Sequence, residues 1–259
     1  MTTPDAGSPD PLKRSSPLTR FRLAPNPGPM SLEGTNSYVI GAGTVVDPGP
    51  DDEAHLQLLA SVGDVRLILI THRHPDHTAG SERLRELTGA PVRALAAEHC
   101  HGGRPLVDGE VIDADGVEVR VLATPGHTSD SVSFHLPDDG INGSVLTGDT
   151  ILGRGTTIID YPDGRLGAYL ESLELLRALG PATVLPAHGP ILPDLSAVAE
   201  AYLEHRSQRL TQVRAALQEL GPEATVEQVA DHVYGDVDPL VRGAAEASVG
   251  AQLDYLRSE

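Results

Sequence analysis

Cysteine, long apolar runs and positive charge are all scarce in this chain of 259 residues. Its single cysteine cannot form an intramolecular disulfide. No run of eighteen apolar residues is present to span a membrane, and the first twenty residues lack the long apolar core of a secretory signal. We therefore expect a cytoplasmic protein without a membrane partner.

The shortage of positive charge bears on the substrate. The chain has 19 Lys and Arg against 37 Asp and Glu, which gives a net charge of −18 at pH 7. Proteins that bind nucleic acids usually neutralise phosphates with Lys and Arg, so this balance weakens the nonspecific capture of a polynucleotide. From Ser196 onward, eleven acidic residues accompany five Arg and no Lys. We expect no binding of duplex DNA, and the acidity favours a small substrate.

The composition that is present suits an ordinary globular chain. Apolar residues make up 39% of the sequence, which is enough for one large α/β domain and a small appendage. Residues 1–20 are rich in Pro, Ser, Thr and Asp without apolar periodicity, which predicts a flexible leader. The main domain is expected over residues 21–195. Beyond it, Ala, Leu, Glu and Gln in a helical pattern predict a separate helical domain over residues 196–259.

Short apolar, β-branched runs alternate with helical patterns along the main domain. The alternation predicts a four-layer αβ/βα sandwich of the α/β (α+β) class, with two sheets packed face to face and helices outside. The expected strands cover residues 37–40, 44–47, 65–70, 92–96, 117–123, 131–136, 144–147 and 182–185, and the expected helices cover 51–62, 78–87 and 166–179.

Four potential metal ligands follow the apolar strand 65–70. They are His72, His74, Asp76 and His77, in the stretch HRHPDHT. Imidazole and carboxylate suit zinc, manganese or iron, and four of them within six positions converge only where the backbone turns tightly. A polar loop with histidines clustered by chance is the alternative, but loops that follow a buried strand often carry sites. The pattern predicts a metal site at a strand end.

Three further segments each place one potential ligand after a short apolar run. The segments TPGHT, LTGDT and LPAHGP contain His127, Asp149 and His188. Strand ends of this kind would bring the three side chains to the same rim as the first four.

Together these motifs resemble the metallo-β-lactamase-fold hydrolases, whose H-x-H-x-D-H signature stands here at positions 72 to 77. The later ligands match that family in order and in type, and the family has the same αβ/βα sandwich. The resemblance implies two divalent metal ions. It implies His72, His74 and His127 as ligands of the first ion, Asp76, His77 and His188 as ligands of the second, and Asp149 as a bridge between them.

A narrower resemblance is to the β-lactamase-like protein 2 group. It rests on four stretches: Gly28 to Met30, Glu33 to Tyr38, Gly148 to Thr157 and His205 to Arg209. That group includes an endoribonuclease specific for single strands, and related sequences act as thioesterases. The resemblance also implies a winged-helix-like C-terminal domain, although the chain stops at Glu259, so the β-wing should be short or absent.

The implied chemistry uses two ions about 3.5–4 Å apart with a shared hydroxide, which supplies a nucleophile at neutral pH. We expect Asp76 to orient this nucleophile and to accept its proton. With His and Asp but no Cys ligand, zinc is the default metal, and manganese and iron remain alternatives. No Ser-His-Asp motif or phosphate-binding glycine loop competes with this site.

Three functional hypotheses follow. On the resemblance we expect first a phosphodiesterase, an endoribonuclease that cuts single-stranded RNA. The alternative, which the acidic surface favours, is a thioesterase or glyoxalase II-type hydrolase of a small acyl-thioester. The third is a metal-binding regulatory protein, although all seven ligands are intact. Asn36 and Thr150 are candidate substrate-binding residues, or else hydrogen-bonding supports of the site. Arg206 and Arg209 would lie near the substrate or tie the last helices to the core.

Overall fold

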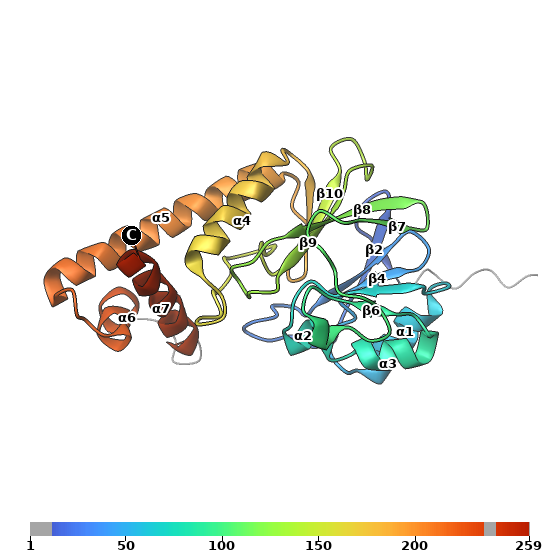
Figure 1. Cartoon of the computed structure of the whole chain (residues 1–259), viewed down its shortest axis with the longest axis horizontal. Coiled ribbons are helices and arrows are strands. Elements are labelled where there is room, and N and C mark those ends of the chain that lie inside the picture. The colour runs from blue at the N-terminus through green and yellow to red at the C-terminus, as the bar shows by residue number, and fades with distance from the viewer. Residues whose placement is uncertain (1–11, 236–241, 259) are drawn as a thin grey trace, which may run out of the picture.

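The structure, a computed structural model, describes residues 12–235 and 242–258. Two β-sheets form its centre, and helices flank them (Figure 1). The first sheet has the order β1-β2-β3-β4-β5-β6 and contains β1 (Lys13–Arg14), β2 (Thr19–Leu23), β3 (Asn36–Ile40), β4 (Thr44–Val46), β5 (Leu67–Leu69) and β6 (Val92–Arg93). The second has the order β11-β10-β9-β8-β7 and contains β7 (Val111–Ala114), β8 (Val117–Ala123), β9 (Val132–Leu136), β10 (Ser144–Gly148) and β11 (Thr183–Pro186).

The main core lies between the two sheets. Tyr38 and Leu69 of the first sheet belong to the same buried cluster as Phe134 and Leu146 of the second. Because successive side chains of a strand point to opposite faces, Val39 points away from this core into the next layer. Burial on both faces explains why the strands appear in the sequence as continuous apolar runs.

Helices cover the outer face of each sheet. On the first sheet, α1 (Glu53–Ser61) and α3 (Ser81–Thr88) contribute buried leucines to the cluster that contains Val39. On the second sheet, α4 (Leu166–Ala178) and the beginning of α5 (Leu195–Leu220) pack on Val145 of β10. These layers confirm the predicted αβ/βα sandwich.

The described chain from Leu195 onward consists of helices and their short connections. Helix α5 packs against α4, and α6 (Val226–Tyr234) and α7 (Arg242–Ser258) follow it at one end of the molecule (Figure 1). The far part of α5 shares a small core with these two helices. The described part of this segment contains no strand, so a β-wing is not seen there. No helix among the described residues is long and apolar enough to cross a membrane.

Asp194 is the N-cap of α5, and its side chain accepts a hydrogen bond from the backbone N–H of Ala197. Such a cap satisfies one of the unpaired donors of the first turn and fixes where the helix begins. The predicted start of a C-terminal domain at Ser196 therefore falls inside this first turn, and the division into domains stays a prediction.

The start of the fold differs from the prediction. The first eleven residues of the expected leader lie outside the described residues, but β1 and the beginning of β2 occupy positions predicted to be flexible. Leu12 is buried, and Asp139 accepts hydrogen bonds from Ser16 Oγ and from the backbone N–H of Leu18. This long-range anchor, which local composition does not reveal, orders the segment. The predicted leader is therefore too long.

Two other elements differ from their predicted form. Strand β7 is short, and the sequence pattern does not predict it. The helix expected at 78–87 is divided into α2 (Pro75–Thr78) and α3. Gly80 lies between them, and a Cβ atom there would stand 2.7 Å from a methyl carbon of Leu56 and 2.9 Å from the carbonyl oxygen of Pro50. Leu56 and Pro50 therefore leave no room for a side chain at the position between the two helices.

We predict that Asp139→Ala destabilises the protein by about 2–4 kcal/mol, because it removes the acceptor of three hydrogen bonds, two of which come from the buried hydroxyls of Ser16 and Ser144. Urea denaturation would measure the change in the free energy of unfolding. Asp138→Ala is the matched control, since Asp138 is the exposed neighbour. Equal stabilities of the two variants would contradict the role assigned to Asp139.

Candidate metal centre

Seven side chains with metal-binding atoms meet where strands of both sheets end. They are His72 and His74 after β5, Asp76 and His77 in α2, His127 after β8, Asp149 after β10 and His188 after β11. Among the described residues, groups of three or more such side chains occur only within this set. All seven residues predicted as metal ligands are therefore brought together, and their role as ligands stays a prediction.

Three histidines form the first group. Nδ1 of His74 lies 3.0 Å from Nε2 of His72 and 3.1 Å from Nε2 of His127. Nitrogen ligands of one tetrahedral zinc ion, with Zn–N bonds of about 2.0–2.1 Å, stand about 3.3 Å apart. The observed spacing suits three ligands of a single ion.

Asp76, His77 and His188 form the second group. Oδ2 of Asp76 lies 3.2 Å from Nε2 of His188 and 3.5 Å from Nε2 of His77. The Nε2 atoms of both histidines are buried without a hydrogen-bond partner. Buried polar atoms without partners are costly, so their convergence fits a bound cation.

Asp149 lies between the two groups. Its Oδ1 is 3.4 Å from Nε2 of His188 and 3.7 Å from Nε2 of His77, while its Oδ2 is 3.8 Å from Nε2 of His127 and 4.0 Å from Nε2 of His72. Oδ1 is also buried without a hydrogen-bond partner. One carboxylate oxygen thus faces each group, which suits a ligand shared by two ions.

Each histidine of the cluster uses its other ring nitrogen to contact an acceptor. Such contacts fix the ring orientation and the tautomer of a metal-binding histidine. The acceptors are Thr71 Oγ1 for His72 (3.0 Å), Asp160 Oδ2 for His74 (3.1 Å), Asp47 Oδ2 for His77 (2.8 Å), the Ile158 carbonyl for His127 (2.6 Å) and the Gly34 carbonyl for His188 (3.1 Å). The inward nitrogens are thereby left with their lone pairs toward the centre.

The charges of the cluster are strongly coupled. Burial disfavours the ionised form of Asp149, but His77 and His188 outweigh it and hold its pKa well below the usual range. Burial likewise opposes protonation of His188, yet Asp149 and Asp76 raise its pKa to about 11. The two carboxylates thus favour positive charge in this part of the cluster, which suits a site that binds a cation.

Asp47 supports the cluster from outside, and sequence reasoning did not identify it. This buried residue follows β4 and accepts hydrogen bonds from the backbone N–H of Thr71 at 2.8 Å, from Thr71 Oγ1 at 2.7 Å and from His77 Nδ1 at 2.8 Å. Its backbone has a positive φ of 51°. In the sequence, Asp47 is a single aspartate at the end of a predicted strand. The residues around it give no indication that it contacts residues 71 to 77.

A glycine allows Asp149 to approach the first sheet. Gly148 has a φ of 51°, and a Cβ atom on it would stand 2.8 Å from both Cβ and Oγ1 of Thr71. A side chain at this position would therefore collide with the residue that Asp47 holds. The ends of β5 and β10 can meet because this position is glycine.

Asn36, a predicted substrate-binding residue, is buried. Its amide nitrogen donates hydrogen bonds of 3.0 Å to the carbonyl oxygens of Pro186 and Gly189. These two residues flank His188, so Asn36 positions the loop that carries this histidine. Its predicted contact with substrate stays a prediction, which this arrangement does not favour.

Thr150 is also buried, and its hydroxyl lies 3.2 Å from that of Thr124. Its carbonyl oxygen accepts a hydrogen bond of 2.7 Å from Tyr169 of α4. Both contacts hold the turn that presents Asp149. The structure therefore places Thr150 among the supports of the site, and its predicted contact with substrate is untested.

The cluster opens through a cavity of about 160 Å³, here called the mouth. His127 and Asp149 line it together with residues that are mostly apolar. These are Pro29, Met30, Leu32, Leu152, Arg154, Gly155, Thr156, Thr157 and Ile158. Access to the candidate centre is thus narrow and largely apolar.

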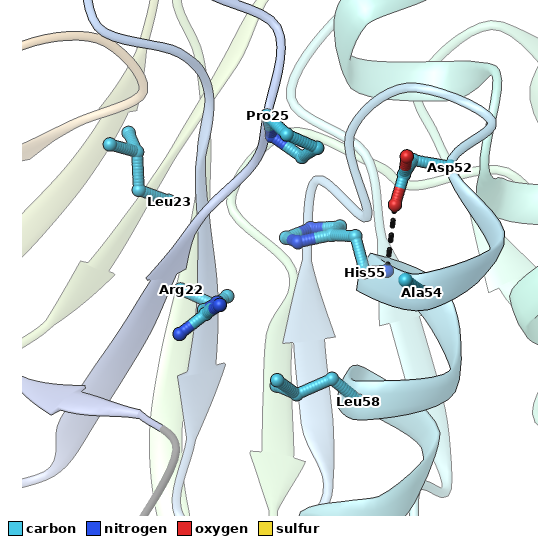
Figure 2. Close-up of a pocket in the computed structure, with 7 residues that line it drawn as sticks. All are labelled: Arg22, Leu23, Pro25, Asp52, Ala54, His55 and Leu58. Carbon is cyan, nitrogen blue, oxygen red and sulfur yellow. Dashed lines mark hydrogen bonds between the residues drawn. The ribbon is translucent and has the colours of Figure 1, made fainter.

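A larger cavity, of about 430 Å³, lies between β2 and α1 and is lined by none of the seven cluster residues (Figure 2). His55 projects toward it, and Asp52 caps the start of α1 by accepting a hydrogen bond from the backbone N–H of His55. Burial lowers the pKa of His55 to about 4, so its ring is neutral at pH 7. Its Nε2 lies 3.0 Å from Ser37 Oγ, which indicates a core histidine rather than a catalytic one.

The comparisons with known proteins agree with this geometry. A family model described as the metallo-β-lactamase superfamily matches residues 30–188. The chain belongs to this superfamily. It is 32% identical over 260 residues to the β-lactamase-like protein 2 homolog of Caenorhabditis elegans, covering 94% of this chain and 85% of the relative. The narrower resemblance is thereby confirmed, and the chain is a hydrolase of the metallo-β-lactamase fold.

Two further proteins are similar over most of their length. An atrochrysone carboxyl ACP thioesterase of Aspergillus chevalieri is 32% identical over 241 residues, covering 87% of this chain and 76% of the relative. The crystal structure of a metallo-β-lactamase family protein from Thermus thermophilus superposes with a TM-score of 0.76 at 24% identity, covering 93% of this chain and 94% of that one. The second likeness shows the fold.

We predict that Asp47→Asn weakens zinc binding about 10- to 100-fold, because an amide presents an NH₂ group to one of the three donors whose hydrogen bonds Asp47 now accepts. Competition with a chelator would measure the affinity. Asp51→Asn, an exposed substitution on the same loop, is the control for the change in charge. The support role would be wrong if both variants bound zinc as the unaltered protein does.

Proposed function

We propose that this protein hydrolyses a small acyl-thioester with two divalent ions, most simply zinc, held by the seven-residue cluster. The observation that carries the proposal is the position of Asp149, with one oxygen toward each group of candidate ligands. When bound, paired ions supply an activated water and polarise the carbonyl that it attacks. A serine or cysteine nucleophile is not needed for such a reaction.

Different side chains of the site have different roles in this proposal. Asp76 is 32% exposed at its side chain, against 12% for Asp149, so it is the more accessible carboxylate of the cluster. We assign to Asp76 the orientation of the attacking water and the acceptance of its proton. The buried supports, Asp47 and Thr71 among them, keep the ligands in place during turnover.

Three observations support a thioester as the substrate. The mouth is narrow and mostly apolar, which suits an acyl chain. The net charge of −18 weakens the capture of a polynucleotide. The relative from Aspergillus chevalieri is named a thioesterase that acts on an acyl carrier protein (ACP).

Phosphodiester cleavage of single-stranded RNA is the second candidate. Two arginines, Arg206 and Arg209, line a cavity next to the mouth and would suit a polyanion. Against this candidate, the described residues that line the mouth include no Phe, Tyr or Trp on which bases would stack. The described residues offer no observation that favours the regulatory hypothesis, and the relative from Aspergillus chevalieri is named as an enzyme.

The decisive test removes the metal and restores it. Protein stripped with a chelator should lose thioesterase activity and regain it with zinc, manganese or iron, and elemental analysis should find about two ions per chain. We expect His74→Ala to lower kcat/KM at least about 100-fold, since it removes a ligand of the first group. His99→Ala, outside the cluster, is the matched control.

The same preparations would be assayed on single-stranded RNA. RNA cleavage that depends on His74, without thioester turnover, would reject the thioesterase proposal in favour of the second candidate. Hydrolysis of neither substrate by protein that contains two ions would reject both.

A further inference from the structure

A second cavity adjoins the mouth on the side of the C-terminal helices. It measures about 240 Å³ and shares Thr156, Thr157 and Ile158 with the mouth. We call it the helical pocket. Its remaining lining residues are His205, Arg206 and Arg209 of α5, Tyr234 of α6, and Ala244, Ala245 and Ser248 of α7. The helical pocket and the mouth are therefore neighbouring cavities that have these three lining residues in common.

Positive charge gathers in the helical pocket although the surrounding segment is acidic. From Ser196 onward, eleven acidic residues accompany five arginines, and two of those five line this one cavity. Among its described lining residues, none is acidic. His205 and Arg209 are four residues apart and therefore lie on the same face of α5. The pocket is chemically suited to an anion.

Arg206 is the more deeply buried of the two arginines that line the pocket. It is only 3% exposed, donates a hydrogen bond to the carbonyl oxygen of Thr157, and lies over the ring of Tyr169 at 5.1 Å from its centroid. Its Nε atom is buried without a hydrogen-bond partner. Because an unpaired buried donor of a guanidinium is costly, it indicates a missing acceptor.

Arg209 is the more accessible of the two arginines. It is half-buried, lies over the ring of Tyr234 at 5.3 Å from its centroid, and donates one hydrogen bond of 2.8 Å to Gln212. A guanidinium carries five N–H donors in a planar fork, which suits the oxygens of a phosphate. The hydroxyls of Thr156 and Ser248 add neutral hydrogen-bonding groups to the same cavity.

We propose that the helical pocket binds the phosphate on the thiol arm of the acyl-thioester, while the thioester itself enters the mouth. The proposal rests on the proposed thioesterase function and names the recognised part of its substrate. A pantetheine arm that carries a phosphate occurs both in coenzyme A and on acyl carrier proteins, so either source presents this chemistry to the pocket.

Binding can be measured without turnover. Calorimetry on the metal-loaded protein would compare 4′-phosphopantetheine with pantetheine, which lacks the phosphate. We expect the phosphorylated compound to bind about tenfold more tightly, because its phosphate would accept charge-assisted hydrogen bonds from the guanidinium groups. Equal affinities of the two compounds would overturn the proposal.

Arg209→Gln tests the pocket directly, and Arg214→Gln is the matched control, because it removes the same charge from an exposed position of the same helix. Arg206 is left intact since it also packs on Tyr169. We expect the ratio of kcat/KM for acyl-phosphopantetheine over acyl-pantetheine to fall about tenfold in Arg209→Gln and to stay unchanged in Arg214→Gln. A ratio that falls equally in both variants would overturn the pocket as the phosphate site.

Two further substrates separate the sources of the phosphate. If Arg209→Gln lowers kcat/KM only for an acyl carrier protein substrate, the pocket binds the phosphate of carrier-bound arms. If it lowers kcat/KM equally for acyl-coenzyme A, the pocket binds the arm that both substrates share. Thioester hydrolysis without any preference for phosphate would overturn this inference and leave the proposed function intact. RNA cleavage impaired by Arg209→Gln, with no thioesterase activity, would overturn both.

Discussion

The buried carboxylate of Asp47 is the constraint on which the candidate centre depends. Strands β4 and β5 are parallel neighbours, so their carboxyl ends lie at the same edge of the first sheet. Asp47 extends from one end and holds both Thr71 and His77 of the other. Thr71 in turn accepts a hydrogen bond from His72 and faces Gly148, which precedes Asp149. One side chain thus orients residues of both candidate metal groups.

Much of the candidate site could be predicted from the sequence, because the ligands sit in compact motifs directly after apolar strands. The supports could not, since Asp47 and Asp160 contact His77 and His74 from positions 30 and 86 residues away. Nothing in their local sequence distinguishes them from other aspartates in loops. The same holds for the loop that carries His188, because the carbonyl oxygens to which the Asn36 amide donates belong to residues 150 and 153 positions away in the sequence.

The sandwich could be predicted from the alternation of strand and helix patterns. The first strands of its first sheet could not. Strand β1 and the start of β2 look like a flexible leader in the sequence, because their order comes from Asp139, more than a hundred residues later. Composition and helical periodicity predict the C-terminal helices. Their relation to the site depends on Arg206, which reaches from α5 to the loop that follows Asp149.

Helix α5 joins the sandwich and the C-terminal helices as one continuous element. It has 26 residues without Gly or Pro, so it is about 39 Å long and lacks the residues at which helices usually kink. One part is fixed to α4 and the second sheet, and the other belongs to the core of α6 and α7. A continuous rod that is anchored at both ends leaves no hinge along its length. A single continuous helix therefore fixes how far the small core of α6 and α7 stands from the second sheet.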